Sequence, residues 1–401
     1  MSDIYEQLRV YIDAKLPVPD ELREQADKLS IYEKIELSIK HRDPVPEIFE
    51  ESTKLLDKWV LALDRDKIYS EILLCCSNRT AGKTYYCGRL LLDLFITFGV
   101  QFAIYTRSGV DLGCVAEGIF GVAINEFEGY SVKEVVTLKN AYSTISISYK
   151  TLDENGQCAP VSMEAGYVLS MRADSKIKTN SSKFNKVGIM FMDEFQADEY
   201  IPRECEKWHN IHVSVARGGG KASRFVPVLM ASNSISIINP YFKYLHLQDK
   251  IQDDTKIYHG VGLTLLRFVN EEVKKAQSES RFNMACGDSQ LMKSNIENEW
   301  LRDCRSCVCK PSNDWGKSTY ICTFTCGNDV FGLRQYDNGL YYVNRSPDWS
   351  CPYTYALSVE GVENIECAKR AVPLNVLARE FLRGRARFSD LSCKSIFMEW
   401  I

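Results

Sequence analysis

The sequence has no long uninterrupted hydrophobic run and no apolar signal-peptide core near its start. The most apolar stretch, LLLDLFITFGVQFAIY, is interrupted by Asp93, Thr97 and Gln101, and the N-terminus MSDIYEQLRVYIDAKL is polar and acidic. A membrane-spanning helix needs about 20 apolar residues in succession, and a signal peptide needs a shorter apolar core. We therefore expect a soluble, intracellular protein with no membrane partner.

Positive charge is not in excess either. The 401 residues include 49 Lys and Arg against 53 Asp and Glu, which gives a formal net charge of −4. This balance offers no global case for nucleic-acid binding, so any such surface must be local. Hydrophobic residues make up 45% of the chain, which is enough for the cores of two domains and an extension.

A disulfide framework is also not expected, although cysteine is not scarce. The 15 cysteines are odd in number and lie among apolar residues, as buried thiols in a reducing compartment do. Four of them, Cys304, Cys307, Cys322 and Cys326, have a spacing close to that of a zinc ribbon. The last two alternate with apolar residues in TYICTFTCG. This favours a strand that turns both thiols into a core, with zinc as the alternative.

What the sequence contains is a phosphate-binding loop, in CCSNRTAGKTYY. It matches G-x-x-x-x-G-K-[ST] except that Ser77 replaces the first glycine. Gly82 lets the backbone approach an anion, Lys83 reaches the β- and γ-phosphates, and the Thr84 hydroxyl binds Mg²⁺. We expect ATP and Mg²⁺ as cofactors, with Arg79 as a further charge acting within its own subunit. The residues expected around the phosphates are Ser77, Asn78, Arg79, Thr80, Ala81, Gly82, Lys83 and Thr84.

The surroundings of this loop are those of a βαβ unit. The apolar residues 72–76 before it are too few for a helix and suit a buried parallel strand. After it, apolar residues recur at helical spacing between positions 90 and 98 and stop at Gly99, and VQFAIYTR follows as a second strand. The pattern predicts an α/β fold with a mostly parallel sheet flanked by helices.

An acidic pair supplies the second half of the expected site. FNKVGIMFMDEFQ contains an apolar strand that ends in Asp193 and Glu194. We expect Asp193 to hold Mg²⁺, directly or through water, and Glu194 to polarise the attacking water. The alternative is an exposed acidic pair that caps a strand. Since no guanine-reading N-K-x-D motif is present, and since the carboxylates are adjacent, ATP hydrolysis is favoured over GTP hydrolysis and over transfer to a small acceptor.

Further candidates follow the next strand and a glycine-rich loop. FVPVLMASNSI places Ser232 and Asn233 at a strand end, where Asn233 would contact the γ-phosphate or the attacking water, unless the segment is only a turn. VSVARGGGKASRF carries Arg217, Lys221 and Arg224. This basic loop could carry an arginine finger to a neighbouring subunit, contact DNA phosphates, or be a solvated turn.

These motifs resemble those of the phage DNA-packaging ATPases, which are the large terminase subunits and their relatives. The nearest likeness is to the encapsidation ATPases of small protein-primed podoviruses. It rests on SNRTAGKT, GYVLSMRADSKIKTNSSKFNKVGIMFMDEF and LMASNSISIINPYF and, more weakly, on EFLRGRARFSDLSCK, and it spans roughly residues 65–400. Ser77 and the first sixty or so residues depart from the family pattern.

The resemblance implies an ASCE-type P-loop motor that hydrolyses ATP to translocate double-stranded DNA into a preformed procapsid. Its subunits would form a homo-oligomeric ring, a pentamer in this family, transiently docked on the portal vertex in the host cytoplasm. A structural RNA is a possible further partner. The resemblance also implies an arginine finger acting in trans, for which Arg217 is expected and Arg224 is the reserve, and a strand end at Asn233 that couples hydrolysis to movement.

We expect four segments along the chain. These are a helical extension over residues 1–60, a P-loop ATPase domain over 61–270, a helical linker over 271–310, and a smaller α+β domain over 311–401. The stretch STISISYK, followed by DENGQ, predicts a hairpin at an edge of the parallel sheet. By the resemblance to terminases, the C-terminal domain is RNase H-like.

The strands of that last domain hold few carboxylates. Asp329 and Asp390 remain, and Asp337 belongs to a turn, which is a thin set for two-metal nuclease chemistry. We therefore expect this domain to bind nucleic acid or the portal and not to cut DNA. A nearby basic cluster could grip a phosphate backbone without reading sequence, unless it is a solvated helix end. Its members are Lys369, Arg370, Arg379, Arg383, Arg385 and Arg387.

Three other functions stay open. The first is a large terminase subunit that also cleaves DNA through its C-terminal domain. The second is a nucleotide-gated assembly protein that binds ATP and hydrolyses little of it. The third is a generic helicase or DNA pump built on the same core.

Overall fold

The computed structural model describes most of the chain and divides it into two units. The N-terminal unit comprises Met1–Ile235 and Ile251–Leu301, and the C-terminal unit comprises Ser236–Lys250 and Arg302–Ile401. The first unit thus joins the expected extension to the loop-bearing sheet. The described residues are 3–107, 111–152, 158–196, 201, 203–217, 223–237, 239–247, 250–252, 254–286, 290–300, 307–326, 329–357, 366–367 and 372–398.

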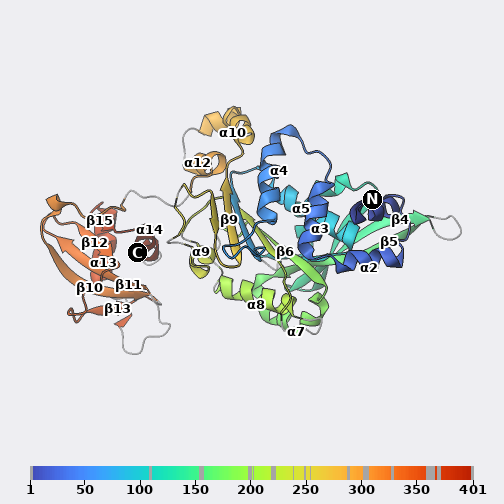
Figure 1. Ribbon diagram of the computed structural model, residues 1–401. Coiled ribbons are helices and arrows are strands. Elements are labelled where there is room, and N and C mark those ends of the chain that lie inside the picture. Colours follow the sequence, from blue (N-terminus) through green and yellow to red (C-terminus); the bar gives the residue numbers. More distant parts are fainter. Residues whose placement is uncertain are drawn as a thin grey trace. The chain divides into compact units, whose positions relative to one another are not determined.

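The N-terminal unit is built on a nine-stranded sheet in the order β3-β4-β5-β2-β6-β7-β1-β9-β8 (Figure 1). All pairings from β5 through β2, β6, β7 and β1 to β9 are parallel, and the strands added at the two edges are antiparallel. The predicted α/β fold with a mostly parallel sheet is confirmed. The strands are β1 (Ile72–Ser77), β2 (Gln101–Thr106), β3 (Tyr130–Leu138), β4 (Tyr142–Leu152), β5 (Cys158–Ser170), β6 (Val187–Asp193), β7 (Val228–Ser232), β8 (Ile257–His259) and β9 (Leu263–Phe268).

The strand order explains why helices cover both faces of this sheet. The connection from β1 to β2 and the connection from β6 to β7 run in opposite directions across the sheet. Because such crossovers are right-handed, their helices α5 and α8 lie on opposite faces (Figure 1). The α-helices of this unit are α1 (Ile4–Asp13), α2 (Asp20–Lys28), α3 (Ile31–Lys40), α4 (Glu47–Val60), α5 (Lys83–Phe98), α6 (Val115–Phe120), α7 (Asp174–Thr179), α8 (Glu204–Ala216), α10 (Glu271–Ser278), α11 (Arg281–Cys286) and α12 (Gln290–Glu297).

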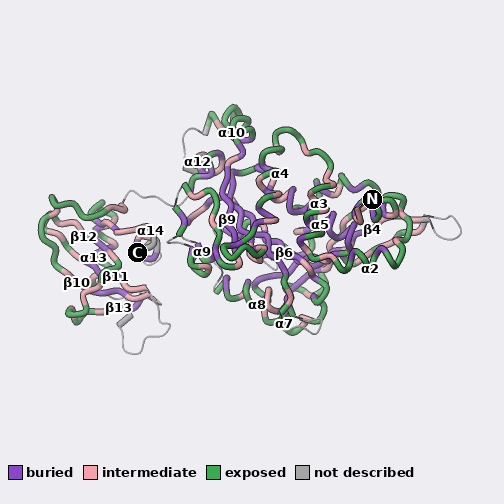
Figure 2. Tube along the Cα trace, in the orientation of Figure 1, coloured by how far each residue is buried: buried purple, intermediate pink, exposed green. Residues whose placement is uncertain are grey.

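The edge formed by β3, β4 and β5 is the predicted antiparallel insertion. STISISYK lies in β4, which pairs antiparallel with both β3 and β5. The expected turn DENGQ lies outside the described residues. Buried residues concentrate in the parallel strands and in the helices that cover them (Figure 2). No helix in the described part of the chain combines the length and the apolar composition needed to cross a bilayer.

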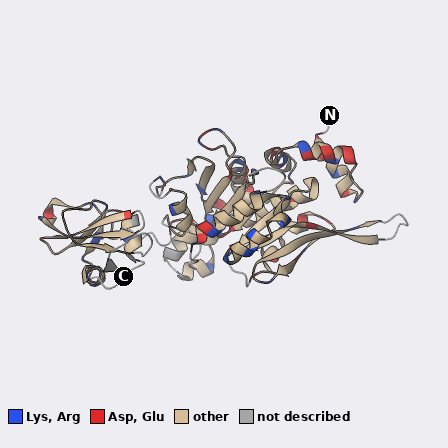
Figure 3. Cartoon of the chain, turned by 90° about the horizontal axis from the view of Figure 1, so that it is seen from below, with Lys and Arg blue, Asp and Glu red and all other residues tan. Residues whose placement is uncertain are grey.

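Helix α5 is buried on almost every side because other helices cover the face that points away from the sheet. All its residues from Tyr86 to Phe98 are buried, and it ends at Gly99, whose φ of 69° is left-handed. Helices α1, α2, α3 and α4 of the expected extension all contact α5. The extension therefore belongs to the same core as the sheet, and its surface carries acidic and basic residues side by side (Figure 3).

A polar contact locks the end of α4 onto α5. Arg42 donates to both carboxylate oxygens of Asp57, at 2.5 and 2.9 Å, and the Tyr86 hydroxyl donates to Asp57 at 2.8 Å. Asp57 belongs to α4 and Tyr86 to α5. Only 15% of the Arg42 side chain and 19% of the Asp57 side chain are exposed. One carboxylate thus satisfies two partners at the helix interface.

We expect Asp57→Ala to lower the free energy of unfolding by about 2 kcal/mol, because Arg42 and Tyr86 would both lose their acceptor. Chemical denaturation measures this difference. Asp66→Ala is the control, since the Asp66 side chain is half exposed and pairs with Arg65 at 3.4 Å. A loss for Asp57→Ala no larger than that of the control would contradict the prediction.

The C-terminal unit is a separate α+β body with a six-stranded sheet in the order β14-β13-β10-β11-β12-β15. Pairing is antiparallel from β10 through β11 to β12, and it is parallel from β10 through β13 to β14 and between β12 and β15. Its elements are α9 (Pro240–Tyr244), β10 (Ser318–Cys326), β11 (Asp329–Tyr336), β12 (Tyr341–Asn344), β13 (Thr354–Ala356), β14 (Glu366–Cys367), α13 (Val372–Leu382), β15 (Ala386–Phe388) and α14 (Leu391–Met398).

The cysteines with zinc-ribbon spacing fall in and around this sheet. TYICTFTC lies in β10, as predicted, with Cys322 fully buried and Cys326 partly buried. Both pack in or against the core of the C-terminal unit, as does Cys307. Cys304 lies outside the described residues. Within the described residues, no three His, Cys, Asp or Glu side chains are grouped to hold a metal ion.

Candidate functional site

The phosphate-binding loop leaves the end of β1 and enters α5, as its motif predicts. Ser77 is the last residue of β1 and is fully buried. The Lys83 ammonium donates to the Ser77 hydroxyl at 2.7 Å and to the backbone oxygens of Ser77 and Asn78 at 3.3 Å. Burial lowers the pKa of Lys83. The serine at the first glycine position therefore holds the lysine that the loop needs.

Gly82 occupies a position that only glycine fits well. Its φ is +89°, a left-handed conformation, and it directly precedes α5. A Cβ added to Gly82 would lie 3.3 Å from Cδ1 of Phe49, closer than ordinary van der Waals contact. Backbone conformation and neighbouring side chain both exclude a larger residue here.

Asp193 is the last residue of β6, and Glu194 follows it at the same edge of the sheet. The Thr84 hydroxyl donates to Oδ2 of Asp193 at 2.7 Å, and the backbone N–H of Glu194 donates to Oδ1 of Asp193 at 3.0 Å. Burial raises the pKa of Asp193, and the hydrogen bond from Thr84 opposes that rise. A cation bound here would favour the ionised carboxylate. The hydroxyl and the carboxylate are oxygen ligands of the kind that Mg²⁺ takes.

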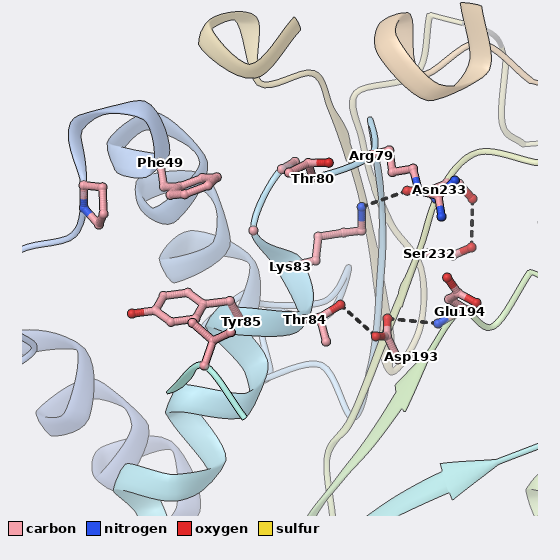
Figure 4. A pocket seen from close by; sticks show the side chains of 14 residues that line it. Phe49, Arg79, Thr80, Lys83, Thr84, Tyr85, Asp193, Glu194, Ser232 and Asn233 are labelled. Carbon is pink, nitrogen blue, oxygen red and sulfur yellow. Dashed lines mark hydrogen bonds between the residues drawn. The ribbon is translucent and has the colours of Figure 1, made fainter. Parts of the chain in front are cut away.

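Glu194 has an uncommon backbone conformation beside this pair. Its φ is +52°, in the left-handed region, where residues other than glycine are rare and often functional. The residue is exposed and lines the cavity next to Asp193 (Figure 4). The conformation leaves the Glu194 carboxylate at the cavity while Asp193 faces Thr84.

Asn233 closes the far side of the cavity, directly after β7. Its Oδ1 accepts a hydrogen bond from the Lys83 ammonium at 3.3 Å. Gln196, which the sequence analysis did not single out, joins the neighbouring segments: its N–H donates to the Ser232 hydroxyl at 3.3 Å, and its Oε1 accepts from the N–H of Ile235 at 3.0 Å. The strand ends of β6 and β7 are thus tied together beside the acidic pair.

One cavity of about 540 Å³ is shared by Lys83, Thr84, Asp193, Glu194 and Asn233 (Figure 4), whereas Ser77, Asn78 and Gln196 do not line it. One end is polar, with Arg79, Lys83 and the acidic pair. The other end is lined by Pro46, Phe49, Tyr85 and Val122, of which the sequence analysis named none. The full lining is Pro46, Phe49, Arg79, Thr80, Ala81, Gly82, Lys83, Thr84, Tyr85, Val122, Asp193, Glu194, Ser232 and Asn233.

The other candidate arginines of this unit have different surroundings. Arg79 is exposed in the loop and lines the cavity. Arg217 is exposed at the C-terminal end of α8 and does not line the cavity. The guanidinium of Arg224, the reserve finger, donates to the backbone oxygens of Val187 and Val215, at 3.1 and 2.8 Å. These bonds fit a structural role in its own subunit better than a finger. Lys221 lies outside the described residues.

The basic cluster of the C-terminal unit is organised by a single buried carboxylate. Glu380 accepts from Arg385 Nε at 2.6 Å, and it pairs with Arg383 at 3.1 Å and Arg379 at 3.4 Å. Although burial opposes ionisation, the hydrogen bond and charge of Arg385 keep the pKa of Glu380 below its usual value.

Each guanidinium around Glu380 stays about half exposed, with side-chain exposures of 60%, 57% and 48% for Arg379, Arg383 and Arg385. Arg387 donates to the backbone oxygens of Gly384 and Ala386. Lys369 and Arg370 lie outside the described residues. The described arginines therefore form a preorganised group that can still reach an external anion.

The carboxylates considered for nuclease chemistry are held by a cation. Arg345 pairs with Asp329 at 2.9 Å and with Asp390 at 3.7 Å. Asp390 also accepts from the N–H of Cys393 at 2.8 Å at the start of α14, and Asp337 accepts from the N–H of Lys317 at 2.7 Å in a turn. Arg345 therefore offsets part of the negative charge of both Asp329 and Asp390.

Comparison with known proteins identifies the family of the chain. The family model of the podovirus DNA encapsidation protein (Gp16) matches residues 60–401. The DNA packaging proteins of Bacillus phages PZA and phi29 are each 23% identical over 349 residues, covering 84% of this chain and 94% of their own.

A solved structure of the bacteriophage phi29 viral genome packaging motor assembly covers 82% of this chain and 95% of its own, at 20% identity and a TM-score of 0.55. At 20% identity this similarity shows a shared fold and does not by itself show a shared function. The family match itself extends over more than four-fifths of the sequence. The chain therefore belongs to the podovirus DNA encapsidation protein (Gp16) family.

Proposed function

We propose that this chain is the ATPase of a viral DNA-packaging motor, which hydrolyses ATP and moves double-stranded DNA into a preformed procapsid. The observation that carries the proposal is the convergence of Lys83, the Thr84–Asp193 pair and Glu194 in one cavity, at the carboxyl ends of β1 and β6, which lie on either side of β7 in the parallel sheet. Membership of a DNA encapsidation family supports DNA as the molecule that is moved and a procapsid as its destination.

The roles follow from these positions. Lys83 exchanges its contacts to Ser77 and Asn78 for the β- and γ-phosphates, and Thr84 with Asp193 holds Mg²⁺. Bound Mg²⁺ neutralises charge on the phosphate oxygens. Glu194 accepts a hydrogen bond from the attacking water and orients it toward the γ-phosphorus. Asn233, bonded to Lys83 before ATP binds, then faces the γ-phosphate.

A homo-oligomeric ring completes the proposal. Arg217 is exposed and apart from its own cavity, so it serves as a finger in a neighbour's site. The similar phi29 structure is that of a viral genome packaging motor assembly, which supports a ring, a pentamer by family resemblance, on the portal vertex in the host cytoplasm. A structural RNA is a further candidate partner.

The test is steady-state ATP hydrolysis against protein concentration, with and without double-stranded DNA. A rate per subunit that rises cooperatively with concentration and increases with DNA supports the motor. A rate per subunit that does not change with protein concentration or with DNA would contradict the motor and favour a nucleotide-gated assembly protein.

We propose that the C-terminal unit binds DNA through the Glu380-centred arginines, without cutting it. The Arg345 contacts to Asp329 and Asp390 support the absence of cleavage. Because binding to phosphates releases counterions, the double variant Arg383→Ala, Arg385→Ala is expected to weaken DNA binding for every sequence. The slope of log K against log salt should become shallower by about 0.9 for each phosphate that the variant no longer neutralises.

Fluorescence anisotropy with labelled duplexes over a salt series measures this slope. Arg65→Ala, an arginine whose side chain is 66% exposed in the N-terminal unit, is the matched control. An unchanged slope in the double variant would remove the DNA contact from this cluster and leave the portal as its partner.

A further inference from the structure

The apolar end of the nucleotide cavity is built partly by the N-terminal extension. Pro46 directly precedes α4 and Phe49 lies in its first turn, and both line the cavity, as do Tyr85 and Val122. Figure 4 shows Phe49 and Tyr85 on the side of the cavity away from Asp193 and Asn233. The family match begins at residue 60, so these two side chains come from a segment that precedes it. A helix outside the matched region therefore contributes to the central site.

Phe49 lies directly beside the phosphate-binding loop. Its ring carbon Cδ1 is 3.3 Å from the place where a Cβ on Gly82 would be. The residue is only partly exposed, and Figure 4 shows the ring facing the space between Thr80 and Tyr85. An aromatic face next to the loop that binds phosphates is available to a planar group attached to those phosphates.

The backbone around Phe49 is tied to the loop through one buried amide. Nδ2 of Asn270 donates to the backbone oxygen of Ile48 at 2.8 Å and to the Ser52 hydroxyl at 2.5 Å. The backbone N–H of Asn270 donates to Oδ1 of Asn78 at 2.9 Å, and Nδ2 of Asn78 donates to the oxygen of Asn270 at 3.2 Å. The position of Phe49 relative to the loop is thereby fixed.

The polarity of the cavity sets the direction of a bound nucleotide. Lys83, Glu194 and Asn233 lie where the γ-phosphate must be, so the base must lie toward the opposite end. Pro46, Phe49 and Val122 have no side-chain hydrogen-bond donor or acceptor, and the Tyr85 hydroxyl is the one polar side-chain group among the four residues at this end. A base at this end is held by stacking and apolar contact from these three residues.

We propose that α4 forms the base-binding wall of the nucleotide site, with the adenine ring of ATP stacked on Phe49. This inference rests on the proposed ATPase function. It assigns to the extension a direct part in nucleotide affinity, through contact with the base and not with the phosphates.

The experiment compares two ligands that differ in the base. Isothermal titration calorimetry measures binding of ATP and of inorganic tripolyphosphate, each with Mg²⁺, to the full chain. Phe49→Ala is expected to weaken ATP about tenfold and to leave tripolyphosphate unchanged. Phe49→Leu, which keeps apolar bulk without the flat ring, is expected to lie between the two. Phe282→Ala, which removes an aromatic ring that is 76% exposed on α11, is the matched control and should bind both ligands as the wild type does.

Each outcome has a distinct meaning. If Phe49→Ala leaves ATP affinity unchanged while Lys83→Ala abolishes binding of both ligands, the proposed stacking of adenine on Phe49 is wrong. The proposed ATPase function is then unaffected. Equal weakening of both ligands in Phe49→Ala would show that Phe49 acts by shaping the loop at Gly82, which also overturns stacking. Failure of the wild-type chain to bind either ligand would instead remove the proposed ATPase.

Discussion

Glu194→Gln is expected to reduce ATP turnover about a thousandfold, the scale of a lost general base, while ATP affinity stays within about twofold, because the mutated carboxylate acts on water and not on the nucleotide. The substitution should preserve the site. The contact of residue 194 with Asp193 is made by its backbone N–H, which glutamine retains. Glutamine also has the same length, so Thr84 and Asp193 keep their 2.7 Å hydrogen bond.

Single-turnover hydrolysis and equilibrium ATP binding measure the two effects separately. Glu206→Gln is the matched control, since Glu206 is a 58% exposed glutamate on α8 and pairs only loosely, at 3.9 Å, with Arg203. Turnover equal to wild type in Glu194→Gln would remove the catalytic assignment. Loss of ATP binding together with turnover would point to a role in holding the nucleotide.

Arg217→Ala is expected to reduce turnover of the assembled protein by about a thousandfold or more, because an arginine finger stabilises charge on the transferring phosphoryl group. A finger supplied in trans has a second signature. When mutant subunits are mixed with wild type, ATP turnover should fall by more than the mutant fraction, since each mutant subunit also disables a neighbouring site. ATP binding to the isolated subunit should not change, because Arg217 does not line its own cavity.

Mixing experiments at fixed total protein distinguish this from damage within one subunit. Arg203→Ala is the control, because Arg203 has a 70% exposed side chain at the other end of the same helix. A decrease in activity that is linear in the mutant fraction would contradict a trans finger. Full activity of pure Arg217→Ala protein would show that Arg217 has no part in hydrolysis. Contact with DNA would then be the favoured interpretation of the basic loop.

The arrangement of the polar end of the site could be predicted from the sequence because it depends on local patterns. The loop motif places Gly82, Lys83 and Thr84 within three consecutive positions, and the apolar strand before Asp193 marks the sheet edge where that residue lies. Parallel strands bring their carboxyl ends to one edge. For these reasons the spatial meeting of Thr84 with Asp193, and of Lys83 with Asn233, follows from short segments read separately.

The apolar end could not be predicted in this way. Phe49 lies 33 positions before Gly82 in the sequence, and nothing in DPVPEIF marks its aromatic ring as part of a binding site. The roles of Gln196 and Asn270 could not be predicted for the same reason, because their hydrogen bonds join segments that are far apart in the chain. The reserve role of Arg224 was weakened by bonds to backbone oxygens, which no residue pattern reveals.

Helix α5 shows that the start of the family match is not the start of the folded core. A helix buried on all sides has no polar face to offer to water, and here four helices that precede residue 61 supply its cover. The sheet and the segment in front of it consequently share one hydrophobic core within one compact unit. A substitution in either must be accommodated by the packing of the other, so the extension is constrained as a protein interior is and not as an appended tail is.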